Sequence, residues 1–194
     1  NTVMTAFIPN TYEVYWNGPF DKLMKRMTDQ QQKFWEGKRM EAAKAHGLTP
    51  QQVYTIASII EEETNKKEDK ALIASVYINR LNKGMKLEAD PTVKYAMRNF
   101  GLKRILKGHL QYDSPYNTYQ HTGLPPGPIC TPGIQTIEAV LASPKTDYIF
   151  FVAKPDFSGY SNFAATYPEH LVFAKAYQRA LDSLIIRQQQ NIAP

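Results

Sequence analysis

The chain has 194 residues, of which 43% are hydrophobic and 21% charged, with a formal net charge of +5 and one cysteine. This length suits one sizeable core rather than two large domains, and no apolar run approaches the roughly 20 residues that a membrane-spanning helix needs. The lone Cys130 excludes an internal disulfide and is expected to be a small packed residue, and the mild positive charge favours polyanionic partners only weakly. We expect a single domain over residues 1–194.

The first fifty residues predict a strand and then one long helix. Residues 7–16 alternate between apolar and polar side chains after a Pro-Asn turn, which is typical of a strand. An amphipathic helix is expected from a cap at Asp21 to about Ala45, with Gly47 ending it. Both elements are interpreted as scaffold.

A central helix is predicted over residues 49–64. Thr49 can cap it, Pro50 suits the first helical position, and Gln52 completes a capping box. At about 100° per residue, the apolar positions of this segment share one face. Its end, Glu61-Glu62-Glu63, should place Glu62 away from that face and the other two carboxyls at its borders.

A carboxyl at the border of a buried face should have a raised pKa and could therefore act as a general acid near neutral pH. The alternative is that the three glutamates form a solvated surface, which is the commoner role of such a run. Three acids in the last turn also oppose the helix dipole, which slightly favours a functional reason for them.

The next elements are two more helices. One is predicted over residues 66–83, with Asn65 and Glu68 as a capping box and Gly84 as its stop, packed antiparallel to the central helix. A short helix over residues 91–98 should be capped by Asp90, after an extended connection over residues 85–89.

Residues 114–133 concentrate proline, glycine and tyrosine, which indicates an ordered loop of one shape. Such a stiff aromatic loop suits a carbohydrate or peptide cleft, and the alternative is a disordered linker. A helix over 134–142, strands over 147–153 and 158–166, and a last helix from 167 to 188 complete the prediction. The fold class is therefore α+β: a mostly helical catalytic domain with a small antiparallel sheet, which leaves room for a lysozyme-like cleft.

Several kinds of site are disfavoured. The four histidines His46, His109, His121 and His170 are far apart and form no metal-binding pattern, so no metal is expected. The sequence has neither a GxSxG elbow nor a phosphate-binding glycine loop, and no cofactor is expected. Carboxylate acid/base chemistry beside an aromatic loop remains, and glycosidic bond cleavage uses this combination.

Six segments, in this order, resemble the successive motifs of the MltG (YceG-like) endolytic murein transglycosylases. They are residues 56–64, 74–81, 84–92, 114–119, 123–129 and 132–133. Residues 8–12 and the terminal Phe163, Thr166, Glu169 and His170 are similar to the outer motifs of that family. The resemblance spans nearly the whole chain.

The resemblance implies a catalytic glutamate at the first acid after Ala-Ser-Ile-Ile, which is Glu61 here. Protonated Glu61 would donate to the oxygen of the β-1,4 bond between MurNAc and GlcNAc and then accept the proton of the C6 hydroxyl, leaving a 1,6-anhydroMurNAc end. Further candidates for orienting Glu61 or the sugars are Glu63, Asn79, Asp90, Tyr116, Asn117 and Tyr119.

The resemblance also implies a place and partners. Peptidoglycan glycan strands are the expected substrate, and peptidoglycan synthases are candidate partners. The chain is expected to be a fragment that lacks an upstream membrane anchor and a LysM-like subdomain. The whole protein would be anchored in the cytoplasmic (inner) membrane, with its catalytic domain in the periplasm or otherwise outside the cytoplasm.

Three alternatives stay open at this point. A muramidase of the same fold would hydrolyse the same bond with water, and a non-catalytic wall-binding module would grip glycan with the aromatic loop. Weak nucleic-acid binding through Lys103, Arg104 and Lys107 ranks last, because these residues at helical spacing are most simply a solvated face. No nucleic-acid partner is therefore expected.

Overall fold

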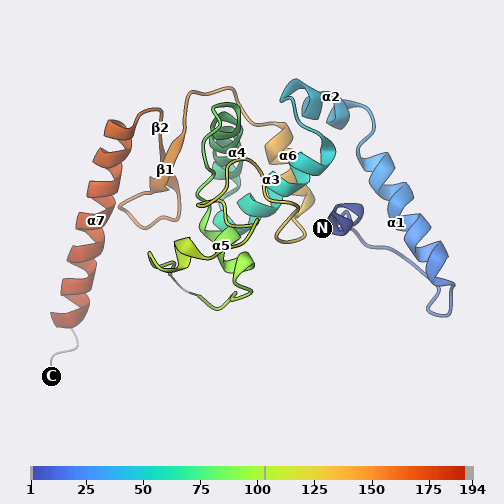
Figure 1. The fold of residues 1–194 in the computed structure, drawn as a ribbon, viewed down its shortest axis with the longest axis horizontal. Coiled ribbons are helices and arrows are strands. Elements are labelled where there is room, and N and C mark those ends of the chain that lie inside the picture. The colour runs from blue at the N-terminus through green and yellow to red at the C-terminus, as the bar shows by residue number, and fades with distance from the viewer. Residues whose placement is uncertain (1, 103, 191–194) are drawn as a thin grey trace.

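The computed structural model describes residues 2–102 and 104–190 and shows a mainly helical α+β fold, as predicted (Figure 1). The helices are α1 (Phe20–Phe34), α2 (Lys38–Ala45), α3 (Pro50–Glu63), α4 (Lys67–Asn82), α5 (Asp90–Ala96), α6 (Ile134–Leu141) and α7 (Tyr167–Gln190), with short 3-10 turns η1 (Val3–Ala6) and η2 (His109–Gln111). Strands β1 (Phe150–Ala153) and β2 (Ser161–Ala164) pair antiparallel, with Phe151 opposite Phe163.

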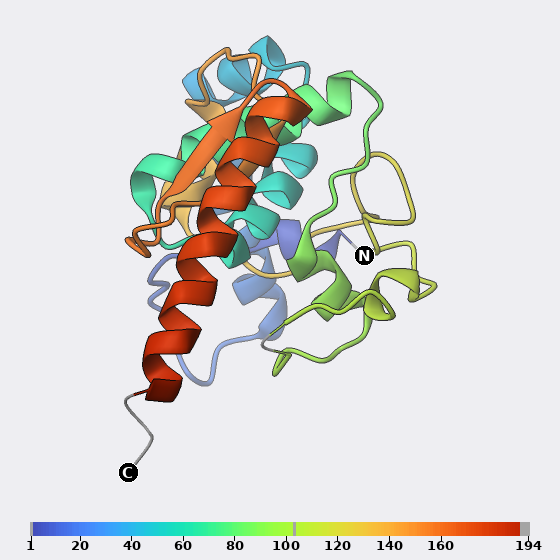
Figure 2. The same cartoon turned by 90° about the vertical axis from the view of Figure 1, so that its left-hand side faces the viewer.

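Helix α3 lies at the centre of the molecule and packs against α4, α6 and α5 (Figure 1). Helices α1 and α7 lie at opposite ends of the long axis of the molecule. The sheet lies between α7 and the central helices, and the lower part of α7 extends away from the rest of the fold (Figure 2).

The predicted start of α3 is confirmed. The Thr49 hydroxyl accepts from the Gln52 amide at 3.3 Å while the Thr49 amide donates to the Gln52 side chain at 2.8 Å, and Pro50 occupies the first turn. The expectation of one buried face is too narrow, because every residue from 53 to 60 is buried. Neighbouring elements surround the middle of the helix, so only its first turn and its last turn, with the three glutamates, reach solvent.

The N-terminal prediction of a strand is wrong. Residues 7–15 have no regular secondary structure, and Tyr15 and Trp16 are 88% and 96% exposed. An alternating pattern gives a strand only where a sheet edge can pair with it, and the described sheet has two strands at the other end of the molecule.

The single long helix predicted over residues 21–45 is two helices. Helix α1 ends at Phe34 and α2 begins at Lys38, with Gly37 between them at a φ of +61°. Glycine adopts this left-handed conformation at no steric cost. The neighbouring Trp35 is 4% exposed, so burial of its large ring fixes the position of the break.

Other boundaries also differ from prediction. Helix α4 has Lys66 at its N-cap without a side-chain cap, so the expected capping box of Asn65 and Glu68 does not form. Ala89 is the N-cap of α5, which places Asp90 in its first turn, and α5 ends at Ala96. Both strands are shorter than predicted. Gly84 follows the end of α4 at a φ of +65°, as expected of a helix stop.

The proline- and glycine-rich loop packs onto α3, as expected of an ordered segment. The Ile129 amide donates to the buried Ser58 hydroxyl at 3.0 Å, and the Cys130 thiol donates to the Ser58 carbonyl at 3.2 Å. Residues 104–107 do not form a helix, and Lys103 lies outside the described residues, so the basic helical face considered above is not seen there. None of the described helices has the length and apolar character needed to cross a membrane.

Candidate active site at the end of α3

Glu61 joins three elements. Its Oε2 atom lies 2.9 Å from Nζ of Lys70 on α4 and also accepts a hydrogen bond from the Thr136 hydroxyl on α6. The ammonium of Lys70 donates to the Thr136 oxygen at 2.6 Å as well, which closes the cluster. The other oxygen, Oε1, is directed toward Gly133, where an added Cβ would lie 3.6 Å from it. Glu61 therefore lies beside the end of the predicted loop, with Oε2 held by α4 and α6.

The expected raised pKa of Glu61 is wrong for this structure. Partial burial acts to raise the pKa, but hydrogen bonds from Thr136 and Lys70, together with the Lys70 charge, outweigh it and leave the pKa below its ordinary value. An adjacent cation favours the charged form of a carboxyl. Glu61 is thus an ionised carboxylate in this state. The pKa of the nearby Cys130 thiol is raised to about 12, mainly by burial, then by the charge of Glu62 and then by the charge of Glu61.

Glu63 has the property that was expected of Glu61. The pKa of Glu63 is raised to about 7, mainly by burial. The charge of Asp90 adds to the rise, while a hydrogen bond from Tyr77 and the charge of Lys94 oppose it. The Tyr77 hydroxyl donates to Oε1 of Glu63 at 2.8 Å, and the Tyr77 side chain on α4 is 1% exposed. Glu63 itself is partly exposed. The two carboxyls, two residues apart, therefore differ in pKa, which is lowered at Glu61 and raised to about 7 at Glu63.

Asp90 and Tyr119 belong to the surroundings of Glu63. The Tyr119 hydroxyl donates to Oδ1 of Asp90 at 2.7 Å, across 29 residues of sequence. Burial, the hydrogen bond to Asp90 and the charges of Asp90, Glu88 and Glu63 all raise the pKa of Tyr119, so it remains a neutral donor. The structure thus gathers three predicted site residues, Glu63, Asp90 and Tyr119, on one side of the end of α3.

Tyr116 lies on the same loop and packs against α5. Its ring centroid is 4.7 Å from that of Tyr95, at a tilt of 50°, and the side chain is partly buried against the core. This packing fixes the loop to α5.

Asn117 and Asn79 have their side-chain donors occupied by backbone groups. Asn117 is fully buried, and its amide donates to the carbonyls of Leu110 and Tyr112 at 3.1 and 2.8 Å. Its side-chain oxygen accepts from the Tyr119 amide at 3.0 Å, so Asn117 positions Tyr119. Asn79 donates to the carbonyls preceding β1 and, nine residues beyond Lys70, lies on the opposite face of α4. The structure does not bring Asn79 to the glutamates.

Lys70, Tyr77 and Thr136 are site residues that the sequence analysis missed. Lys70 lies seven residues before Tyr77, so both occupy the same face of α4, with Ile73 between them. A lysine on an otherwise apolar helical face is a signal for a buried ion pair, because a buried ammonium needs a partner. Tyr77 gave no comparable signal, since an aromatic residue in an apolar stripe is ordinarily core.

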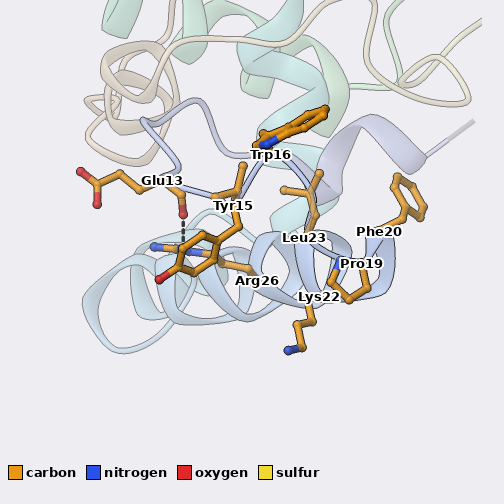
Figure 3. A pocket seen from close by; sticks show the side chains of 10 residues that line it. Glu13, Tyr15, Trp16, Pro19, Phe20, Lys22, Leu23 and Arg26 are labelled. Carbon is orange, nitrogen blue, oxygen red and sulfur yellow. Dashed lines mark hydrogen bonds between the residues drawn. The ribbon is translucent and has the colours of Figure 1, made fainter.

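A separate cavity of about 720 Å³ lies at the N-terminal end, between residues 13–16 and the start of α1 (Figure 3). Trp16, Phe20 and Leu23 line it together with Arg26, whose guanidinium donates to the carbonyl of Glu13. None of its lining residues belongs to the predicted site. The cavity therefore adds nothing to the cluster around α3.

Comparisons with known proteins agree with the order of motifs. The sequence profile of the YceG-like family matches residues 1–176. An endolytic murein transglycosylase of Bacillus subtilis (strain 168) is 42% identical over 165 residues, which cover 84% of this chain and 44% of that protein. An endolytic murein transglycosylase of Streptococcus pneumoniae serotype 2 (strain D39) is 40% identical over 114 residues, which cover 57% of this chain and 21% of that protein.

A crystal structure of a putative yceG-like protein from Listeria monocytogenes has the same fold. It superposes with a TM-score of 0.72 at 34% identity, over 86% of this chain and 53% of the other. The chain spans less than half the length of the two transglycosylases described above. The family profile nevertheless covers most of the chain, and the fold agrees with that of a relative. The chain therefore belongs to the YceG-like family.

Proposed function

We propose that this protein is an endolytic peptidoglycan lytic transglycosylase, which cleaves the β-1,4 bond between MurNAc and GlcNAc and leaves 1,6-anhydroMurNAc ends. Relatives named endolytic murein transglycosylases, 40–42% identical to the chain, support the reaction class. The observation that carries the chemistry is a partly exposed carboxyl, Glu63, whose pKa of about 7 lets it hold and release a proton at neutral pH.

The reaction needs one group that is first an acid and then a base. Protonated Glu63 donates to the glycosidic oxygen as the bond from that oxygen to C1 of MurNAc breaks and positive charge develops at C1. The C6 hydroxyl oxygen of the same sugar then attacks C1, and its proton returns to Glu63. No water is consumed, and the carboxyl ends in its starting state.

The resemblance assigned this role to Glu61, and the physical chemistry of the site favours Glu63. Glu61 would have to give up its ion pair with Lys70 before it could hold a proton, whereas the surroundings of Glu63 already favour the protonated form. The charge of Asp90 also acts on Glu63, and Asp90 and its hydrogen-bond partner Tyr119 are candidates for holding the sugars. Glu61 as the acid/base is the alternative assignment.

The test compares Glu63→Gln, Glu61→Gln and the matched control Glu62→Gln, which alters the exposed glutamate between them. Each variant is incubated with purified peptidoglycan, the soluble products are analysed by mass spectrometry, and binding to insoluble peptidoglycan is measured by co-sedimentation. We expect E63Q to lose anhydro products while still binding glycan, and E62Q to behave as the unaltered protein.

Other outcomes separate the alternatives. Loss of cleavage in E61Q with full activity in E63Q would return the acid/base role to Glu61. Reducing ends, which are heavier by one water than anhydro ends, would identify a muramidase. Binding without any cleavage by the unaltered protein would identify a wall-binding module.

We also propose, from the resemblance alone, that the protein is held at the outer face of the cytoplasmic membrane and meets peptidoglycan synthases there. Membrane fractionation of cells, with protease added from outside, tests the location. Cross-linking in those cells tests the partners. Recovery of the protein from the soluble cytoplasm would contradict the proposal.

A further inference from the structure

We propose that Tyr77 is a positioning residue for the reaction, and that the two-stranded sheet acts on the site by bracing the Tyr77 ring. The inference rests on the proposed function of Glu63. Tyr77 donates its hydroxyl to Oε1 of Glu63 at 2.8 Å from a side chain that is almost completely buried. A buried ring has few alternative rotamers, so its hydroxyl fixes one oxygen of the carboxyl in place.

The bracing of Tyr77 comes from a part of the chain that is distant in sequence. Its ring meets Phe151 of β1 edge to face, with centroids 6.0 Å apart and an interplanar angle of 83°. Phe151 lies opposite Phe163 of β2 in the strand register, and their rings are 6.3 Å apart. Edge-to-face aromatic pairs add stabilisation beyond the area that they bury. The sheet thus holds the ring that holds the carboxyl.

The groups that face Glu63 differ in what they do to it. From α5, the charge of Asp90 favours the protonated form and that of Lys94 favours the ionised form, and from the loop Tyr119 is close enough to respond to the Glu63 charge. From α4, Tyr77 favours the ionised form because it donates a hydrogen bond to it. Burial and the charge of Glu63 raise the pKa of Tyr77 well above its ordinary value, so Tyr77 remains a donor at any working pH.

Removing the Tyr77 hydroxyl should therefore shift the proton affinity of Glu63 upward and loosen its orientation. The test is Tyr77→Phe, which keeps the ring, against the matched control Tyr54→Phe. Tyr54 is equally buried, and its hydroxyl donates at 2.9 Å to the Phe7 carbonyl and lies near Thr131 and Cys130, whereas the Tyr77 hydroxyl donates to Glu63. Both substitutions delete one buried hydroxyl, so a general loss of stability is common to them.

The readout is the pH dependence of anhydro-end formation. In Y77F we expect the alkaline decline of kcat/KM to move up by roughly one pH unit, because a hydrogen bond to a charged group favours ionisation by about that much. We also expect kcat to fall several-fold. In Y54F the profile should keep its position. Equal profiles in Y77F, Y54F and the unaltered protein would overturn the proposal.

A second measurement does not need activity. Carbon-13 NMR titration of the glutamate carboxyls, with Glu63→Gln identifying the signal, should show the Glu63 titration displaced upward in Y77F. If the protein forms no anhydro ends, the proposed function fails, yet this titration still decides the role of Tyr77. If Y77F does not fold, Phe151→Leu, which weakens the brace and keeps the hydroxyl, should lower kcat without abolishing cleavage, and an unchanged kcat would count against the role of the sheet.

Discussion

Lys70 Nζ and Glu61 Oε2 lie 2.9 Å apart and connect the first turn of α4 to the last turn of α3. The side chains are 11% and 32% exposed, so this is a largely enclosed ion pair with a polar third member, Thr136. It compensates part of the unfavourable effect of three acidic residues at the C-terminal end of a helix. The pair fixes the segment that carries Glu63.

Replacing Lys70 with methionine should destabilise the fold by about 1–3 kcal/mol at pH 7, because an enclosed carboxylate loses its partner. The partial solvent exposure of Glu61 keeps this loss small. The folded-state pKa of Glu61 is lowered, so its stabilisation is present above the unfolded pKa and disappears as pH falls through the folded pKa. The difference in unfolding free energy between K70M and the unaltered protein, measured with urea, should therefore become smaller in acid.

The control for this prediction is Lys25→Met. Lys25 pairs with Asp29 on α1 at 2.8 Å, with side chains 74% and 55% exposed, and such pairs contribute little. We expect a change below about 0.5 kcal/mol. If the loss of stability in K70M did not change with pH, the ion pair would not be its cause.

Glu63 should give the opposite dependence of stability on pH. Its folded-state pKa is raised from 4.5 to about 7, so its contribution is fully present below about 4.5 and is lost as pH rises to about 7. This shift corresponds to on the order of 3 kcal/mol. In Glu63→Gln the amide does not ionise, so the decline of unfolding free energy between these pH values should be smaller.

The measurement is urea unfolding at half-unit steps from pH 4 to 8, with Glu62→Gln as the control. Glu62 is exposed, and E62Q should keep the pH dependence of the unaltered protein. Parallel curves for E63Q and the unaltered protein would contradict a raised pKa at Glu63.

Asn117 should matter for the loop more than for the sugar. Asn117→Ala removes a fully buried amide and leaves the Leu110 and Tyr112 carbonyls without this donor, which should cost about 2–4 kcal/mol. We expect the thermal unfolding temperature to fall by several degrees. The control Asn82→Ala, at an exposed position, should change that temperature little. Full stability with selective loss of glycan binding would instead favour direct contact with the substrate.

The capping box of α3 gives a prediction of stability alone. Thr49→Ala removes the side-chain acceptor for the Gln52 amide and should cost about 1 kcal/mol in chemical unfolding. Thr28→Ala on exposed α1 is the matched control, because that hydroxyl donates to carbonyls within its own helix and alanine has the higher helix propensity. A loss in T28A equal to that in T49A would mean that capping is not the reason.

Helix starts and stops were predictable from the sequence where contacts between neighbouring residues decide them. The Thr49–Pro50–Gln52 start of α3 and the glycine stop after α4 depend on contacts within four residues, and both were confirmed. The order of motifs was sufficient to identify the family. The strand expected over residues 7–16 failed because strand formation needs a partner that the pattern itself cannot supply. The helix break at Gly37 was likewise not predicted, because the burial of Trp35 in the tertiary structure fixes its position.

The amino-acid sequence by itself determined that two carboxyls would lie at the borders of the end of α3, because helical periodicity fixes directions. Only the tertiary structure decided their protonation. Lys70 and Thr136 reach Glu61 from 9 and 75 residues away, while Tyr77 reaches Glu63 from 14. A pKa is set by the charges, donors and solvent that the fold places around a group, and none of these is a property of the segment that carries it.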